Sequence, residues 1–227
     1  MQKALDIRIL SRVPIFDGMR TDELEKLLGV AQVRDYARGA LIFSEGDPGN
    51  AMLILLSGAV KVHRLSPDGR EVTLAILRAG DCLGEMSLLD GLSRSASADA
   101  IEHTTALEIR RDDFLRLLRS RPEMSLAIIQ ILAARLRQTD RRLEHLVLGD
   151  ARSRVLGVLL DLAAGHGVPY SGGTKIDIRL THQEIAELAG IARETASRIL
   201  SELADEGLIQ LDERHIIVNA SARESAP

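Results

Sequence analysis

Between residues 33 and 110, short runs of Val, Ile and Leu alternate with turn residues, and this alternation constrains the fold more than any other feature. Three turn motifs separate the runs: GDPGN (46–50), SPDGR (66–70) and RAGD (78–81). Pro, Asp and Gly supply the backbone dihedral angles that tight turns need, so the runs on either side of SPDGR are predicted to be strands joined by a tight turn. Several such strands at close spacing predict a small β-barrel or a jelly roll.

From about residue 111 the sequence becomes helical, and one apolar stripe runs along it. Its members are separated by three or four residues, as in a coiled-coil heptad: Ile129, Leu132, Leu136, Thr139, Leu143 and Leu146. A stripe this narrow is typical of a helix that pairs with its copy in a two-fold dimer, and a helix packed on its own domain is the alternative. Thr139 is the polar member, which would set the register or contact a ligand at the dimer axis.

Gly149 and Asp150 interrupt this stripe, and Asp150 is placed to cap a new helix, so we expect a domain boundary here. The last segment is expected to hold a helix, a loop over residues 165–173, a strand, two short helices and a terminal hairpin over residues 208–218. The expected domains are residues 1–121, 122–149 and 150–227.

The stretch GEMSLLDGLSRSASA (84–98) places Glu85 and Arg94 nine positions apart among mostly apolar and small residues. A buried, unpaired ion is costly, so each of the two needs a partner. They could pair with each other, or they could bracket a ligand that carries both an anion and a hydroxyl group. Arg94 offers a planar fork of donors for a phosphate, while the carboxylate of Glu85 suits a ribose hydroxyl. Gly84 would let the backbone approach the ligand, and Ser95 would add a hydroxyl.

The motif THQE (181–184) has the spacing of a capping box, and the helix that it starts is expected to end at Gly190. The second helix of this pair carries four outward residues near its N-terminus: Arg193, Glu194, Ser197 and Arg198. Arginine can bind guanine O6 and N7, and glutamate can accept from cytosine N4. With the following hairpin, these features predict a winged helix-turn-helix that binds double-stranded DNA. We expect further contacts, mainly to DNA phosphates, from Arg179, Thr181, His182, Gln183 and Thr195.

Composition narrows the classes of function. The net charge is -4, so DNA binding depends on a local surface rather than on a general positive charge. The single Cys82 excludes an internal disulfide and a cysteine-ligated iron–sulfur cluster within one chain, and it fits a reducing compartment. The six histidines are scattered without ligand spacing or a nucleophile–base grouping, so we predict neither an enzyme nor a metal site. No apolar run approaches the length of a membrane helix, and we expect a cytoplasmic protein.

Three motifs in a fixed order carry a resemblance to a known family. The stretch from Gly80 to Ala98 looks like the phosphate-binding cassette of cyclic-nucleotide-binding domains. Together with the upstream EGDPGNAMLILLSGAVKV, the striped helix and the helix pair near the C-terminus, it makes residues 12–218 resemble the CRP/FNR family of bacterial transcription regulators, in its cyclic-AMP-responsive branch. The resemblance implies an α+β fold with an N-terminal β jelly-roll cyclic-nucleotide-binding domain, a long dimerisation helix and a C-terminal winged helix-turn-helix.

The resemblance also implies roles for residues of the cassette. Gly84 and Glu85 match positions that hold the ribose 2′-hydroxyl, and Met86 follows them in the same segment. Arg94 and Ser95 match positions that hold the cyclic phosphate.

On the striped helix, Thr139 matches a residue that contacts adenine. The next position departs from the cyclic-AMP-responsive branch, which has a serine where this chain has Asp140, contributed across the dimer. A carboxylate can accept from the amino group of adenine, but it could equally favour guanine, whose N1–H and amino group both donate.

The implied function is a homodimeric transcription regulator that responds to a cyclic nucleotide, with cyclic AMP expected and cyclic GMP left open. It would bind a palindromic site with TGTGA-like half-sites, take RNA polymerase as a partner, and need no covalent cofactor. A regulator of the same fold that binds DNA without ligand, or with cyclic GMP, is the alternative.

Overall fold

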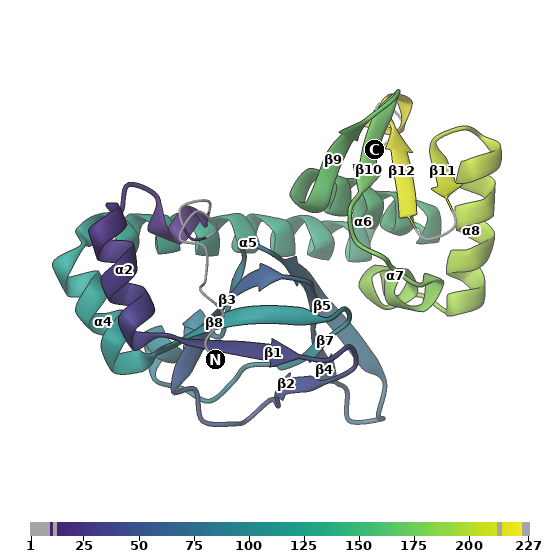
Figure 1. Ribbon diagram of the computed structural model, residues 1–227. Coiled ribbons are helices and arrows are strands. Elements are labelled where there is room, and N and C mark those ends of the chain that lie inside the picture. Colours follow the sequence, from purple (N-terminus) through teal and green to yellow (C-terminus); the bar gives the residue numbers. More distant parts are fainter. Residues whose placement is uncertain (1–9, 11–12, 213–214, 224–227) are drawn as a thin grey trace. The chain divides into compact units, whose positions relative to one another are not determined.

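The turn-punctuated runs of residues 32–110 form eight strands in two four-stranded sheets (Figure 1). The strands are β1 (Gln32–Tyr36), β2 (Leu41–Phe43), β3 (Ala51–Ser57), β4 (Ala59–Leu65), β5 (Glu71–Arg78), β6 (Cys82–Leu83), β7 (Ser97–Ala100) and β8 (Thr104–Arg110). One sheet has the order β1-β8-β3-β6 and the other the order β2-β7-β4-β5. The pairs β1–β8, β3–β6, β3–β8, β2–β7 and β4–β7 are antiparallel.

The computed structural model describes residue 10 and residues 13–212 and 215–223. It divides into two units, of which the first comprises Met1–Arg64 with Leu74–Ala133 and the second comprises Leu65–Thr73 with Ala134–Pro227. None of the helices in the described part of the chain is long and apolar enough to cross a membrane.

Strand β3 shows why this region folds as two packed layers. Successive side chains of a strand point to opposite faces, and β3 is apolar on both. Leu53 and Leu55 lie in a cluster formed by residues of both sheets, whereas Met52 and Ile54 lie in a second cluster with residues of the helices. The continuous apolar run in the sequence is therefore a strand buried on both sides.

The first unit also contains helices that cover one of the sheets. They are η1 (Pro14–Phe16), α2 (Thr21–Val30), the short α3 (Glu85–Asp90), α4 (Arg111–Ser120) and the start of α5 (Pro122–Leu148). Phe114 of α4 and Met124 and Ile128 of α5 are buried in the same apolar cluster as Met52 and Ile54.

The exposed apolar stripe on α5 shares Ile129, Leu136 and Leu143 with the stripe that the sequence predicted. The exposed apolar side chains of the helix are Leu126, Ile129, Leu136, Leu143 and Val147. They are three, four or seven residues apart, and at this spacing positions 133 and 140 lie on the same face of the helix. Leu132 instead packs against the apolar cluster of the first unit, because this part of α5 uses that face to cover the sheet. The side chain of Leu146 lies outside the described residues.

The second unit contains the end of α5, three further helices and a small antiparallel sheet of order β11-β12-β10-β9. Its elements are α6 (Ala151–His166), β9 (Gly167–Tyr170), β10 (Gly173–Ile176), α7 (His182–Ala189), α8 (Arg193–Asp205), β11 (Ile209–Asp212), β12 (His215–Asn219) and η2 (Ala220–Arg223). Asp150 caps α6, since its side chain accepts from the Ser153 N–H at 2.7 Å.

Residues 165–173, which the sequence predicted to be a loop, contain strand β9 and its turn to β10. Gly172 adopts a φ of 79° at this turn, a conformation that favours glycine. Gly167 allows close pairing, because a Cβ at this position would lie 2.2 Å from Cγ2 of Thr174. The prediction failed because strand formation here depends on pairing with β10 rather than on local β-propensity.

Candidate functional sites

Gly84 and Arg94 meet at the start of α3. Gly84 is the N-cap of this helix, with a φ of 79° that favours glycine. A Cβ at position 84 would lie 2.2 Å from Nη1 of Arg94, so the absence of a side chain gives the guanidinium its space. The short helix α3 begins at Glu85, directly after this glycine.

The guanidinium of Arg94 is held by the main chain. Nη1 donates to the carbonyl of Gly84 at 2.8 Å, and Nη2 donates to the carbonyl of Ala51 at 2.5 Å. The residue is only 7% exposed, and its Nε is buried with no hydrogen-bond acceptor among the described residues. Nε of Arg94 is therefore a buried donor without an acceptor in the described part of the chain.

Glu85 is 1% exposed and acts on Arg94 through its charge. Burial lowers the pKa of Arg94 below its usual value, while the charges of Glu85, Asp47 and Glu108 oppose this shift. Arginine stays charged at neutral pH, so a buried cation and a buried carboxyl group lie close together here. The sequence left open whether Glu85 and Arg94 pair with each other or bracket a ligand. The charge of Glu85 acts on Arg94, but the described hydrogen bonds of Arg94 go to the carbonyl groups of Gly84 and Ala51.

Phe43 contacts Arg94, and the sequence analysis missed this residue. Cζ of Arg94 lies 4.4 Å from the centroid of the Phe43 ring, which is a cation–π contact. The sequence offered only a weak indication of this role, because Phe43 is one of three phenylalanines in the chain and lies in the region that was expected to form strands. Nothing in the sequence connects it to a residue 51 positions later.

The remaining predicted ligand residues are solvent-accessible. Met86 is 47% exposed, and Ser95, next to Arg94, is also exposed. Thr139 and Asp140 are exposed residues of α5 in the second unit, and the hydroxyl of Thr139 donates to the carbonyl of Arg135 at 2.9 Å. The structure thus brings together Gly84, Glu85 and Arg94, while a joint role with Thr139 and Asp140 stays a prediction.

The helix pair α7–α8 begins with the capping box that the sequence indicated. The side chain of Glu184 accepts from the N–H of Thr181 at 2.6 Å, and Oγ1 of Thr181 accepts from the N–H of Glu184 at 3.2 Å. Gly190 ends α7 in the left-handed conformation, with a φ of 63°. Ile185, Ile199 and other apolar residues of both helices are buried, so the outer face of α8 is set by packing.

On that outer face, Arg193, Glu194 and Arg198 are exposed. Nη1 of Arg198 donates to Oε1 of Glu202, four positions later on the same helix, at 2.5 Å. Ser197 is only partly exposed, and its hydroxyl is hydrogen-bonded to Nδ1 of His182 at 2.9 Å.

Three of the residues predicted to contact DNA phosphates lie in the helix pair α7–α8 or just before it. Gln183 is exposed and donates to Glu187 at 2.8 Å, Thr195 is partly exposed, and Arg179 is exposed just before α7.

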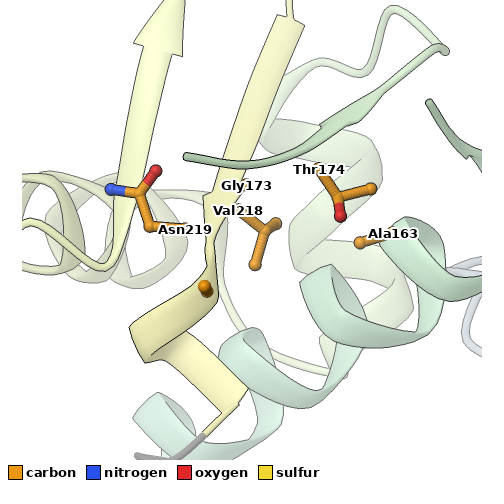
Figure 2. Close-up of a pocket in the computed structure, with 6 residues that line it drawn as sticks. Ala163, Gly173, Thr174, Val218 and Asn219 are labelled. Carbon is orange, nitrogen blue, oxygen red and sulfur yellow. The ribbon is translucent and has the colours of Figure 1, made fainter. Parts of the chain in front are cut away.

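A cavity of about 230 Å³ lies in the second unit, between α6 and the sheet (Figure 2). Its lining consists of Ala163, Gly173, Thr174, Val218, Asn219 and Ala220. These side chains are small and carry no charge, and none belongs to the predicted ligand or DNA residues. Within the described residues, no group of three or more His, Cys, Asp and Glu side chains is arranged to hold a metal ion.

Comparison with known proteins found matches along most of the chain. Two family models match, the cyclic nucleotide-binding domain over residues 33–121 and the Crp-like helix-turn-helix domain over residues 153–223. A CRP-like cAMP-activated global transcriptional regulator of Mycobacterium tuberculosis is 37% identical over 215 residues, which cover 95% of this chain and 96% of the relative. The chain belongs to the CRP/FNR family. The Cyclic AMP receptor protein of Thermus thermophilus is 41% identical over 209 residues, covering 92% and 94% of the two chains.

Membership of the CRP/FNR family confirms the fold class expected from the sequence, and it makes this chain a DNA-binding transcription regulator with a cyclic-nucleotide-binding domain. Solved structures of the family include the c-di-GMP responsive global regulator CLP of Xanthomonas campestris. It matches with a TM-score of 0.72 and 26% identity, covering 88% of this chain and 100% of that one. The names of these similar proteins therefore refer to different nucleotides, cyclic AMP for two of them and c-di-GMP for the third.

Proposed function

We propose that this protein is a homodimeric regulator that binds cyclic AMP in the pocket of Gly84, Glu85 and Arg94 and then binds a palindromic DNA site with TGTGA-like half-sites. The observation that carries the proposal is the buried guanidinium of Arg94, whose Nε–H has no acceptor among the described residues. A buried donor without an acceptor costs roughly 1–3 kcal/mol. A phosphate oxygen would supply the acceptor and form a charge-assisted hydrogen bond.

The other groups of the pocket fit the sugar of the same ligand. Glu85 is buried beside Arg94, and an ionised carboxylate accepts hydrogen bonds but does not donate them, which suits a ribose hydroxyl. Exposed Ser95 would add a donor to the phosphate. A nucleotide with one phosphate therefore offers an acceptor to Arg94 and a hydroxyl donor to Glu85.

Cyclic AMP is proposed because the relatives from Mycobacterium tuberculosis and Thermus thermophilus are described as cAMP-activated or as a Cyclic AMP receptor protein. Cyclic GMP is the competing ligand, because the carboxylate of Asp140 could accept a hydrogen bond from adenine or from guanine. The c-di-GMP responsive relative is a reason to include that dinucleotide in the same titration.

The dimer is proposed from the exposed stripe of α5, defined by Leu126, Ile129, Leu136, Leu143 and Val147. Its members repeat with heptad spacing over most of a 27-residue helix. Two copies of the helix packed along this line would cover the apolar side chains, and a two-fold axis would then give a palindromic DNA site.

On DNA, Arg193 and Arg198 would each bind a guanine, and Glu194 would accept from the cytosine paired with the inner one. Arg198 must leave Glu202 to do so, and an exposed pair of this kind contributes little to stability. We expect RNA polymerase to be a further partner of the DNA-bound dimer.

Ligand contact with Thr139 and Asp140 would favour one arrangement of α5, and the break at Gly149–Asp150 would pass this change to α6 and the helix pair beyond it. Such coupling requires that the ligand bind the two arrangements with different affinities.

Calorimetry tests the ligand site directly. Purified protein is titrated with cyclic AMP, cyclic GMP and cyclic di-GMP, with and without operator DNA. We expect cyclic AMP to bind most tightly, and Arg94→Ala to lose about 2–4 kcal/mol of binding free energy. Arg116→Ala is the matched control, because it removes an exposed arginine that pairs with Asp113 on α4. Absence of binding, or binding that is indifferent to Arg94→Ala and Glu85→Gln, would overturn the site assignment.

The alternative, a regulator that binds DNA without ligand, is favoured if the DNA affinity is the same with and without saturating nucleotide.

A further inference from the structure

Phe43 differs from the other two phenylalanines of the chain. Phe16 and Phe114 are 1% and 0% exposed within an apolar cluster of the first unit. Phe43 packs only partly into the apolar cluster between the two sheets, and its ring carries the guanidinium of Arg94 at 4.4 Å. The Phe43 ring therefore contacts both the apolar cluster and the cationic side chain of Arg94.

A β-bulge helps to place this ring. On strands β2 and β7, Leu41 pairs with Asp99, but Phe43 pairs with Ala98, so two steps along β2 match one step along β7. A bulge of this kind inserts one extra residue and redirects the side chains that follow it. The ring of Phe43 thus has an orientation that regular pairing would not give.

The main chain around Phe43 is tied to the main chain of Arg94 independently of either side chain. The Arg94 N–H donates to the carbonyl of Asp47, and the Gly46 N–H donates to the carbonyl of Arg94, both at 2.9 Å. The N–H of Glu45 donates to the hydroxyl of Ser97, also at 2.9 Å. These hydrogen bonds hold the backbone next to Phe43 and the backbone of Arg94 at a fixed distance from each other.

From this arrangement we propose that Phe43 is a positioning residue for ligand binding: its ring orders the guanidinium of Arg94 and so sets the affinity of the pocket for a cyclic phosphate. This inference rests on the proposed function of the pocket. An arginine side chain loses much conformational entropy when it is ordered. Arg94 is already ordered by the ring and by the carbonyls of Gly84 and Ala51, so the ligand avoids part of that cost.

The role is separable from simple packing by comparing variants. Phe43→Leu and Phe43→Met both keep an apolar side chain but remove the ring face, and methionine is flexible enough to fill the space if leucine impairs folding. Phe43→Tyr keeps the ring. Phe114→Leu is the control for lost aromatic packing, because Phe114 is buried in the first unit and no described arginine or lysine lies over its ring.

The measurements are the dissociation constant for cyclic AMP by calorimetry and the midpoint of thermal unfolding. We expect Phe43→Leu and Phe43→Met to weaken binding about three- to tenfold. Phe43→Tyr and Phe114→Leu should stay within about twofold of the unchanged protein, although Phe114→Leu should lower the unfolding midpoint.

A double-mutant cycle completes the test, because the ring acts through Arg94. In an Arg94→Gln background, with ligand titrated to millimolar concentration, Phe43→Leu should change the dissociation constant less than twofold. An equal effect in both backgrounds, or no effect of Phe43→Leu in a protein that binds cyclic AMP through Arg94, overturns this inference and leaves the proposed function intact. Failure of the unchanged protein to bind any cyclic nucleotide overturns both.

Discussion

Replacing Gly84 with alanine should disrupt the ligand pocket more than it disrupts the fold. The left-handed φ of 79° at this position costs an alanine about 1–2 kcal/mol of folding stability. The new Cβ would also lie 2.2 Å from Nη1 of Arg94 and push the guanidinium away from the Gly84 carbonyl. Loss of a charge-assisted hydrogen bond to the ligand corresponds to about 1.5–3 kcal/mol, or roughly tenfold to hundredfold in affinity.

Gly39→Ala is the matched control for this variant. Gly39 lies in the same unit and has a φ of 82°, but a Cβ there would meet no atom within 4 Å. Both variants should lose stability in denaturant unfolding, and Gly84→Ala should lose more because the guanidinium gives up its bond to the Gly84 carbonyl, while only Gly84→Ala should lose cyclic AMP affinity in calorimetry. If Gly84→Ala bound the nucleotide as tightly as Gly39→Ala, the space at position 84 would not control Arg94, and our account of the pocket would be wrong.

Three further predictions concern assembly and DNA binding. Leu136→Glu should convert the dimer to monomers, because it places a charge in the apolar stripe of both copies; a wild-type monomer at micromolar concentration in sedimentation would contradict this. Arg198→Ala should cost about 1–3 kcal/mol per half-site and relax the preference at one base pair, as measured by selection from random duplexes, whereas an unchanged selected site would show that another residue reads that base. Gln183→Ala should weaken binding to all sequences alike, and a change of preferred sequence would argue that Gln183 contacts a base.

Some features of both sites follow from local sequence. The capping box of Thr181 and Glu184 connects residues three positions apart on one helix turn, so its hydrogen bonds are visible in the spacing. Gly84 and Arg94 belong to one short motif, and the cost of burying charge indicates that the motif forms a site. Local rules also place the cap of α6 at Asp150.

Other features required the tertiary structure. Arg94 donates to the carbonyl of Ala51 and stacks on Phe43, and both partners reach it through strand pairing rather than through sequence proximity. Leu132, a predicted member of the exposed stripe on α5, instead packs against the apolar cluster of the first unit. A heptad pattern identifies apolar positions but does not say which neighbour each of them covers.

The sequence by itself determined that this chain has a turn-rich β domain, a long helix and a helix-turn-helix, because hydrophobic period, caps and turn residues act over a few positions. Only the tertiary structure decided which side chains surround the buried cation and which apolar residues stay exposed. These depend on contacts between residues tens of positions apart, and a β-bulge or a change of packing face alters them without leaving a local mark in the sequence.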